Sequence, residues 1–117
     1  MITRHHSSGR LSQAVEHPLS GTMVVTSGVT ADDPTGSIEA QTKNVLDKID
    51  GFLAEAGTDK HHLSHVYVWL ANIADFAAMN TVYDAWVSAD NKPARACVET
   101  RLADPRLRVE IQVFAVK

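Results

Sequence analysis

The stretch NKPARACVET, residues 91–100, places Arg95 among small and apolar residues, two positions before Cys97, the single cysteine of the chain. A guanidinium binds a carboxylate through two parallel hydrogen bonds and does not lose its charge, so Arg95 is a candidate anchor for an acidic small molecule. Glu110, near the end of the sequence, is a candidate for orienting water or moving a proton. Cys97 is more typical of a small buried residue than of a nucleophile, because no histidine is evidently paired with it.

The histidines of KHHLSH, at positions 61, 62 and 65, raise the question of a metal site. Positions 61 and 65 of a strand are too far apart for a compact site, and no carboxylate or cysteine completes the set. We therefore expect no metal ion and no cofactor, and interpret the histidines as part of a solvated loop.

Two helices are expected to position the candidate residues. Apolar residues recur at spacings of three and four from Ser37 to Ala56, and Gly57 supplies the stop. A second helix is predicted from about Ile73 to Val87, with Asn72 and Asp75 at capping positions. The aromatic residues of MNTVYDAW in this helix are explained by the helix core without a ligand.

The remaining apolar runs indicate strands at 22–28, 63–71, 95–102 and 107–116, and a short strand at 12–15 completes the set. We expect 95–102 and 107–116 to form an antiparallel pair through the turn-like ADPR. The order predicts a single α+β domain over residues 1–117, a mixed sheet with two helices on one face. No repeat or linker interrupts it.

Alternation along these strands predicts which faces the candidates occupy. Arg95 and Cys97 should share a face, while Ala96 and Val98 should point to the helices. In the last strand Glu110 is expected to point away from the helices, on the same side of the sheet as Arg95. The helix-free face then meets either water or another subunit, and the apolar content of residues 66–70 favours a subunit.

Composition bounds the partners. Eleven Lys and Arg against fourteen Asp and Glu give a formal net charge of −3, and no basic block is present, so nucleic acid is not expected as a partner. No apolar run approaches the roughly 20 residues that span a bilayer, and residues 1–10 lack the apolar segment of a secretory signal. A cytoplasmic protein that does not bind membranes is the expectation.

The ordered set GRLSQAV, VVTSGV, QTKNVLDKIDGFLAEAG, DFAAMNTVYDAW, PARACVE and VEIQVFA, which covers nearly the whole chain, resembles the YjgF/YER057c/UK114 proteins, the Rid family of imine deaminases. The resemblance implies a chorismate-mutase-like fold, assembled as a homotrimer around a central barrel, with three sites in the clefts between subunits. It implies hydrolysis of 2-imino acids or enamines, such as 2-aminoacrylate and 2-iminopropanoate, to a 2-oxo acid and ammonia without a cofactor.

The resemblance also assigns residues. The family's site arginine and glutamate match Arg95 and Glu110. Its serine–glycine pair at a strand end matches Ser27 and Gly28, and its helix asparagine matches Asn80. Cys97 matches a position whose backbone groups, rather than its thiol, face the substrate in the family.

One position departs from the family pattern. Many active members have a tyrosine in a glycine–proline–tyrosine context near the start, whereas this chain has GRLSQ, with Leu11 at the aligned position and Arg10 in place of the proline. Val29 and Thr30 likewise stand where glutamine and proline are frequent. The hypothesis is a pocket suited to a larger or more apolar imino acid.

Each candidate also has a structural interpretation. Arg95 would form a salt bridge across the sheet with Glu99 or Glu110, Asn80 would lie on the helix surface, and Ser27 with Gly28 would end a strand. Other functions also remain open: a regulatory module that binds a 2-oxo acid without turnover, a chaperone-like holdase, or a ribonuclease. The missing basic groove weighs against the last.

Overall fold

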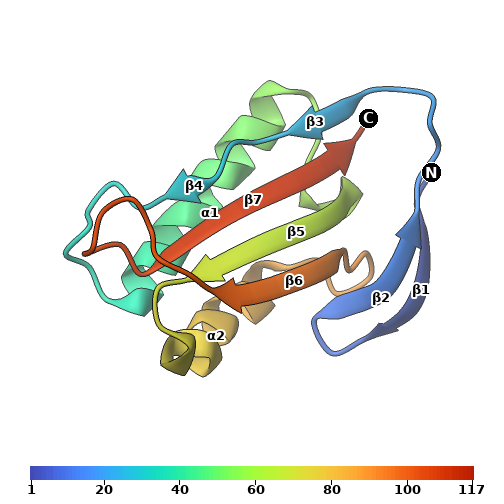
Figure 1. The fold of residues 1–117 in the computed structure, drawn as a ribbon. Helices are drawn as coiled ribbons and strands as arrows, with labels where there is room; N and C mark the ends of the chain where they lie inside the picture. The colour runs from blue at the N-terminus through green and yellow to red at the C-terminus, as the bar shows by residue number, and fades with distance from the viewer.

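A seven-stranded mixed sheet carries two helices on one of its faces, behind the sheet in the view of Figure 1. The computed structural model describes residues 1–117. The elements in chain order are β1 (Thr3–Ser8), β2 (Leu11–Glu16), β3 (Met23–Val25), β4 (Val29–Thr30), α1 (Ile38–Glu55), η1 (Lys60–His62), β5 (Leu63–Leu70), η2 (Ile73–Asp75), α2 (Phe76–Trp86), β6 (Ala94–Glu99) and β7 (Val109–Val116). The predicted α+β class with two helices on one face is confirmed.

The strand order is β1-β2-β6-β5-β7-β3, with β4 pairing to β7 as well. β5 runs parallel to β6 and antiparallel to β7, and it lies between them (Figure 1). The predicted hairpin of 95–102 with 107–116 is therefore wrong. The connection between these strands passes the end of β5, where Thr100 donates a backbone hydrogen bond to Leu70 and Ala71 donates one to Arg108. Nearly continuous apolar sequence in β5 suits this central position.

Both predicted helices are present, and the expected end signals act as predicted except Asp75, which makes no side-chain capping hydrogen bond at the start of α2. The Ser37 hydroxyl accepts a hydrogen bond from the Ala40 amide at the start of α1, and Gly57, with φ of 82°, follows its last turn. The predicted second helix divides into the short turn η2, which Asn72 caps, and α2. The start of α2 at Phe76 matters for the site described below, because it sets which residues face β6.

The N-terminal strands are only partly predictable from the alternation of apolar and polar residues. Residues 3–8 form β1, which the sequence analysis did not predict, because nearly all of its side chains are exposed and carry no apolar alternation. The short strand expected at 12–15 is present as β2. Of the segment expected as one strand at 22–28, only Met23–Val25 forms a strand, β3; residues 26–28 belong to no strand, and β4 begins after them at Val29. This interruption places Ser27 and Gly28 beside β7.

The core lies between the helices and the sheet. α1 buries Val45, Leu46, Ile49 and Leu53 at helical spacing. The facing strand β7 buries every second residue, from Val109 to Ala115. Eighteen buried apolar residues form one contiguous cluster, and this cluster fixes which strand faces point toward the helices.

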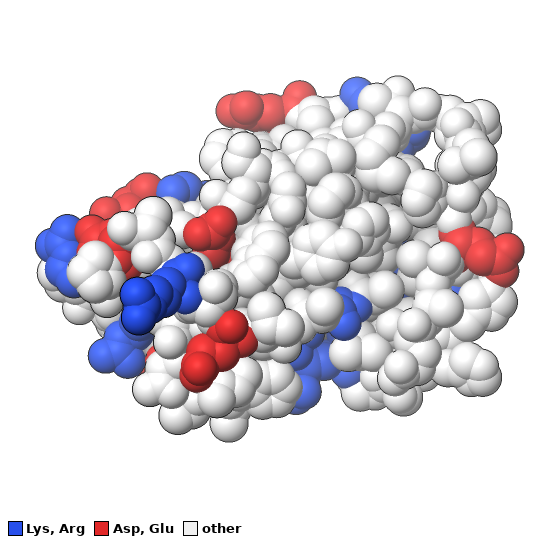
Figure 2. All heavy atoms as spheres, viewed as in Figure 1, with Lys and Arg blue, Asp and Glu red and all other residues white.

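The other face of the sheet has no helix over it. Aromatic rings gather there: His65 stacks on Phe114 with centroids 4.0 Å apart, and Tyr67 meets the edge of both rings. Val98 on β6 is 51% exposed on this face. Figure 2 shows few charged side chains over the middle of the sheet, with charges mostly toward its ends. No helix is both long and apolar enough to cross a membrane.

Candidate functional site

Arg95 lies under α2, on the helix-covered side of β6. Its Nη1 donates a hydrogen bond of 2.8 Å to Oδ1 of Asn80. Its Cζ lies 4.7 Å from the ring centroid of Tyr83 and 5.9 Å from that of Phe76. A guanidinium over an aromatic face is attracted to the negative side of the ring, so α2 holds Arg95 by both a hydrogen bond and aromatic contacts.

One stripe of α2 makes all these contacts, through four residues at helical spacing: Phe76, Met79, Asn80 and Tyr83. Asn80 is not the surface residue of the structural interpretation, because it is only 3% exposed. The predicted core role of the aromatic residues in this helix holds for Tyr83 and Trp86, both of which are buried. Tyr83 also contacts Arg95, which the sequence analysis missed; the signal available was its position three residues after Asn80.

Arg95 has no acidic partner within the chain. It takes part in none of the ion pairs, and the expected alternative of a salt bridge with Glu99 or Glu110 is wrong. Glu99 instead accepts a hydrogen bond of 2.8 Å from the Ile73 amide. Burial lowers the pKa of Arg95, yet an arginine remains protonated at neutral pH. The result is a half-buried positive charge that is free to bind an anion.

Two buried polar atoms beside Arg95 also lack partners. The Nδ2 of Asn80 and the hydroxyl of Tyr83 make no hydrogen bond in the chain. Burial raises the pKa of Tyr83, so the phenol stays protonated at neutral pH. Buried donors without acceptors are uncommon in folded proteins, and here they lie beside an unpaired guanidinium. The neighbourhood of Arg95 is thus rich in donors and poor in acceptors.

Glu110 and Gly28 meet on the opposite side of the molecule. β4 pairs with β7 so that Thr30 faces Glu110, and the carboxylate of Glu110 lies against the backbone of Gly28. A methyl group on Gly28 would lie 2.8 Å from the Glu110 Cδ, closer than nonbonded carbons approach. Glu110 forms no ion pair within the chain, which leaves its carboxylate available. Glycine at 28 is what allows this close approach.

The prediction that Arg95 and Glu110 share one face of the sheet is wrong. Arg95 pairs in register with Val66, which is fully buried under the helices, whereas Glu110 pairs with Trp69 on the other face. Two strand spacings and three residues of rise put their Cα atoms about 14 Å apart. The two side chains therefore point to opposite faces within one chain.

The reversal has a physical cause in β6. Ala96 and Val98 are apolar and were therefore expected on the helix-covered face, yet both are exposed on the helix-free face. Arg95 and Cys97 occupy the covered face instead, because α2 supplies a polar acceptor and aromatic rings for the guanidinium there. The predicted alternation of side chains along β6 is correct, but the two sets of residues occupy the opposite faces from those predicted.

Cys97 packs against the core on the same face as Arg95. Burial raises the pKa of the Cys97 thiol, and the nearby positive charge of Arg95 opposes this only in part. The thiol is therefore protonated at neutral pH, which agrees with the expectation that it is not a nucleophile.

Leu11 begins β2, next to the tip of the β1–β2 hairpin. Arg10 at this tip forms two hydrogen bonds to the Asp84 carboxylate, of 2.6 and 2.9 Å. Asp84 follows Tyr83 in α2, so the hairpin tip is fastened beside the residues that hold Arg95. The replacement of proline by Arg10 thus has a structural consequence at this site.

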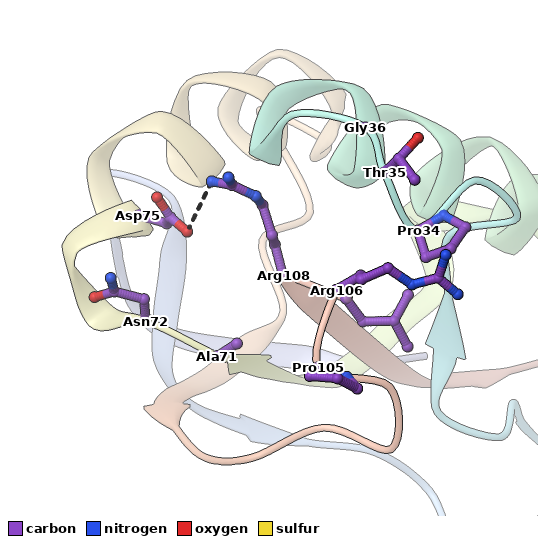
Figure 3. Close-up of a pocket in the computed structure, with 10 residues that line it drawn as sticks. Pro34, Thr35, Gly36, Ala71, Asn72, Asp75, Pro105, Arg106 and Arg108 are labelled. Carbon is purple, nitrogen blue, oxygen red and sulfur yellow. Dashed lines mark ion pairs between the residues drawn. The ribbon is translucent and has the colours of Figure 1, made fainter.

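Ser27 and Gly28 line a separate hollow of about 450 Å³ between the β3–β4 edge and α1. A second hollow, of about 480 Å³, lies where α1 begins, and there Arg108 faces Asp75 at 3.8 Å (Figure 3). Neither hollow contains Arg95. Within this single chain, the structure does not bring the candidate residues together in one cavity.

The histidines of residues 61–65 have unrelated hydrogen-bond partners. His61 contacts Ser88, His62 contacts Asp59, and His65 contacts the neighbouring Ser64. They belong to η1 and β5, not to a continuous loop. No group of three or more His, Cys, Asp or Glu side chains is arranged to hold a metal ion.

Comparisons with known proteins agree along the whole chain. A family model described as Endoribonuclease L-PSP matches residues 1–117. A RutC family protein of Haemophilus ducreyi is 38% identical over 115 residues, 98% of this chain and 96% of that relative. A crystal structure of a YjgF family protein from Neisseria meningitidis is 42% identical with a TM-score of 0.80, covering 100% of this chain and 95% of that one. A Salmonella typhimurium relative named 2-iminobutanoate/2-iminopropanoate deaminase is 32% identical over 104 residues, 83% of this chain and 81% of that relative. The family resemblance inferred from the sequence is confirmed.

Proposed function

The chain belongs to the Endoribonuclease L-PSP family, the group of YjgF and RutC proteins, and we propose that it hydrolyses small 2-imino acids or their enamine tautomers to 2-oxo acids and ammonia. The observation that carries the proposal is the Arg95 guanidinium, half-buried, held by Asn80 and without a carboxylate partner. Similarity to a relative named as an imine deaminase supports the same activity.

The residues have distinct roles in this reaction. Arg95 binds the substrate carboxylate and so fixes the position of the neighbouring C=N carbon. Water adds to the protonated imine carbon, and Glu110 orients this water and accepts its proton. The C–N bond then breaks with the proton delivered to nitrogen, so that R–C(=NH)–COO⁻ and H₂O give R–CO–COO⁻ and NH₃. Backbone groups of Gly28 and Cys97 are the candidates for contacting the nitrogen.

A complete site requires a second copy of the chain. Arg95 and Glu110 point to opposite faces of one sheet, so one substrate cannot touch both within a single chain. We propose a homotrimer in which Arg95 of one copy meets Glu110 and Gly28 of the next. The exposed aromatic and apolar face around Tyr67 and Val98 supports such packing, because large apolar patches on a sheet mark interaction surfaces.

Leu11 bears on the choice of substrate. A leucine offers no hydroxyl to a polar substituent, and it lies next to Arg10, which is bound to Asp84. The proposed pocket therefore favours an imino acid with a larger or more apolar side chain. A panel of imines made from different amino acids tests this hypothesis, and preference for the smallest imine would contradict it.

The function is tested by following the disappearance of 2-iminopropanoate, made in place by an amino-acid oxidase, and the release of ammonia. Wild type should accelerate hydrolysis, and Arg95→Ala should lower kcat/KM at least about a hundredfold by removing a charge-assisted anchor. Gel filtration shows whether the variant keeps the wild-type assembly. No acceleration across the panel by a correctly assembled wild type would overturn the proposal.

The same assay separates the alternatives. A regulatory module would bind 2-oxo acids with Arg95 yet release no ammonia above the spontaneous rate. A holdase would suppress aggregation of unfolded proteins even in Arg95→Ala. The family description names an endoribonuclease, but a net charge of −3 without a basic block offers no groove for the phosphates of RNA.

A further inference from the structure

We propose that Tyr83 is a positioning residue: its ring face supports the Arg95 guanidinium and keeps one edge of it open for a carboxylate. The inference rests on the proposed function for the identity of the ligand, but not for the geometry. Tyr83 belongs to neither the candidate residues nor the family-derived assignments.

The hydrogen bonds of Arg95 show which edge is open. Only Nη1 is engaged, by Asn80 Oδ1 and more weakly by the Met79 sulfur. The N–H groups of Nε and Nη2 have no partner in the chain. These two groups form one side of the guanidinium fork, the side that takes a carboxylate through two parallel bonds. Asn80 thus holds one end of the guanidinium, and the contact between the guanidinium and the ring of Tyr83 fixes the plane of the guanidinium.

Tyr83 is rigid enough to serve as this support. Its side chain is fully buried, and its ring packs against Trp86 with centroids 5.7 Å apart. Next to it, the bidentate Arg10–Asp84 pair ties α2 to the β1–β2 hairpin. A ring held on several sides restricts the rotamers of the side chain that lies on it.

Tyr83 contacts Arg95 through its ring and not through its hydroxyl. Its hydroxyl is buried and has no partner, and phenylalanine would fill the same space without that cost. The helix also provides an internal contrast. Trp86 is a still larger aromatic residue that donates a hydrogen bond to Asp50, and it forms neither a hydrogen bond nor a cation–π contact with Arg95. Trp86→Leu therefore shows how much of an effect comes from the loss of aromatic bulk in α2 without the loss of the ring that contacts Arg95.

The test compares Tyr83→Phe, Tyr83→Leu and Trp86→Leu by titration calorimetry with 2-oxobutanoate, a product of the proposed class, and by imine turnover. Tyr83→Leu should raise Kd and KM between about threefold and thirtyfold, the range of a partly desolvated cation–π contact. Tyr83→Phe keeps the ring and should stay within about twofold of wild type. Trp86→Leu removes only a neighbour of the Tyr83 ring, so it should lower the melting temperature and raise Kd clearly less than Tyr83→Leu does.

Two patterns would overturn the inference: equal effects of Tyr83→Leu and Trp86→Leu on Kd, or an effect of Tyr83→Phe as large as that of Tyr83→Leu. If the imine assay shows no turnover while the binding pattern holds, the proposed reaction fails and the positioning role stands. If turnover is normal and the two leucine variants behave alike, the positioning role fails alone.

A measurement on the wild type covers the case in which Tyr83→Leu does not fold or no 2-oxo acid binds. Proton NMR of the arginine side chains should show the Arg95 Hε and Hη signals shifted upfield by the ring current of Tyr83, relative to those of exposed Arg101. Signals of Arg95 at the positions of exposed arginines would refute the contact.

Discussion

The two charged candidates stand in contrasting surroundings. Arg95 is enclosed by α2 of its own chain, with an amide oxygen and aromatic rings around its guanidinium. Glu110 lies on the helix-free face against the backbone of Gly28, with no side chain of its own chain to pair with it. A single chain therefore holds the proposed anchor, Arg95, with its own residues and leaves the proposed water-positioning residue, Glu110, without a side-chain partner.

The two faces of the sheet therefore differ in what they contribute to the fold and to the proposed site. Its covered face carries the packing energy of the fold and can hold a buried charge only because α2 satisfies it. Its helix-free face, called the bare face below, combines aromatic residues with Glu110, and it is the face that we propose packs against a partner copy. Substitutions on the bare face should therefore act through assembly, and those on the covered face through the anchor.

The largest effect is expected from Val98→Glu, which places a charge on the bare face where Val98 is 51% exposed. The isolated chain should fold, because this side chain faces away from the core. Assembly should be lost, and kcat/KM should fall more than about a hundredfold, because an unpaired charge is costly in a buried interface. Light scattering after gel filtration gives the mass.

Ile73→Glu is the matched control for this substitution, since Ile73 is 47% exposed at the start of η2, which is not a strand of the sheet. It should keep both the assembly and the activity. If Val98→Glu is fully active and assembles like the wild type, the bare face is not the interface between copies.

A smaller effect is expected from Gly28→Ala. The added methyl would meet the end of the Glu110 side chain, which can rotate away, so the fold should lose no more than about 1 kcal/mol while the carboxylate is displaced. We expect kcat to fall about tenfold or more with a smaller change in KM, because the anchor on the other face is untouched.

Gly51→Ala, in the exposed part of α1, serves as its control. A methyl at Gly51 meets no atom within 4 Å, so the substitution should stabilise the chain by about 0.5–1 kcal/mol with unchanged kinetics. Unchanged kinetics in Gly28→Ala as well would argue against a role for Glu110.

The smallest effect concerns Cys97 on the covered face. Because its pKa is raised, a smaller fraction of the thiol is ionised at neutral pH than in a free cysteine. Alkylation by iodoacetamide at pH 7 should be slower than that of glutathione and should accelerate as the pH rises toward the raised pKa. Cys97→Ser should keep turnover within about threefold. Fast alkylation at pH 7 with loss of activity would reinstate a thiol mechanism.

The sequence predicted the fold class, both helices and the central strands because their apolar periodicity reflects one core. It did not predict β1, whose side chains are nearly all exposed, or the position of β5 between β6 and β7, since strand order depends on contacts distant in sequence. A plausible turn between two apolar runs suggested a hairpin that the β5 pairing prevents.

The site shows the same limit. Residue types and family resemblance picked out Arg95, Asn80 and Glu110, and the structure joins the first two. The faces of β6 were predicted the wrong way round because a charged residue such as Arg95 is expected to point away from the helices, whereas it lies on the helix-covered face. The position of α2 explains this placement of Arg95, and it also shows that Tyr83 contacts the guanidinium.

The central claim is that one site takes Arg95 from one copy and Glu110 from the next, and mixing two inactive variants tests it most directly. The Arg95→Ala and Glu110→Ala variants are denatured, mixed in equal amounts and refolded together. Each variant refolded alone serves as a control. In a ring with one site at each interface, about a quarter of the sites receive both intact residues, so about a quarter of wild-type turnover should return. If the mixture remains as inactive as each variant alone while gel filtration and mass spectrometry show mixed assemblies, the shared site is contradicted.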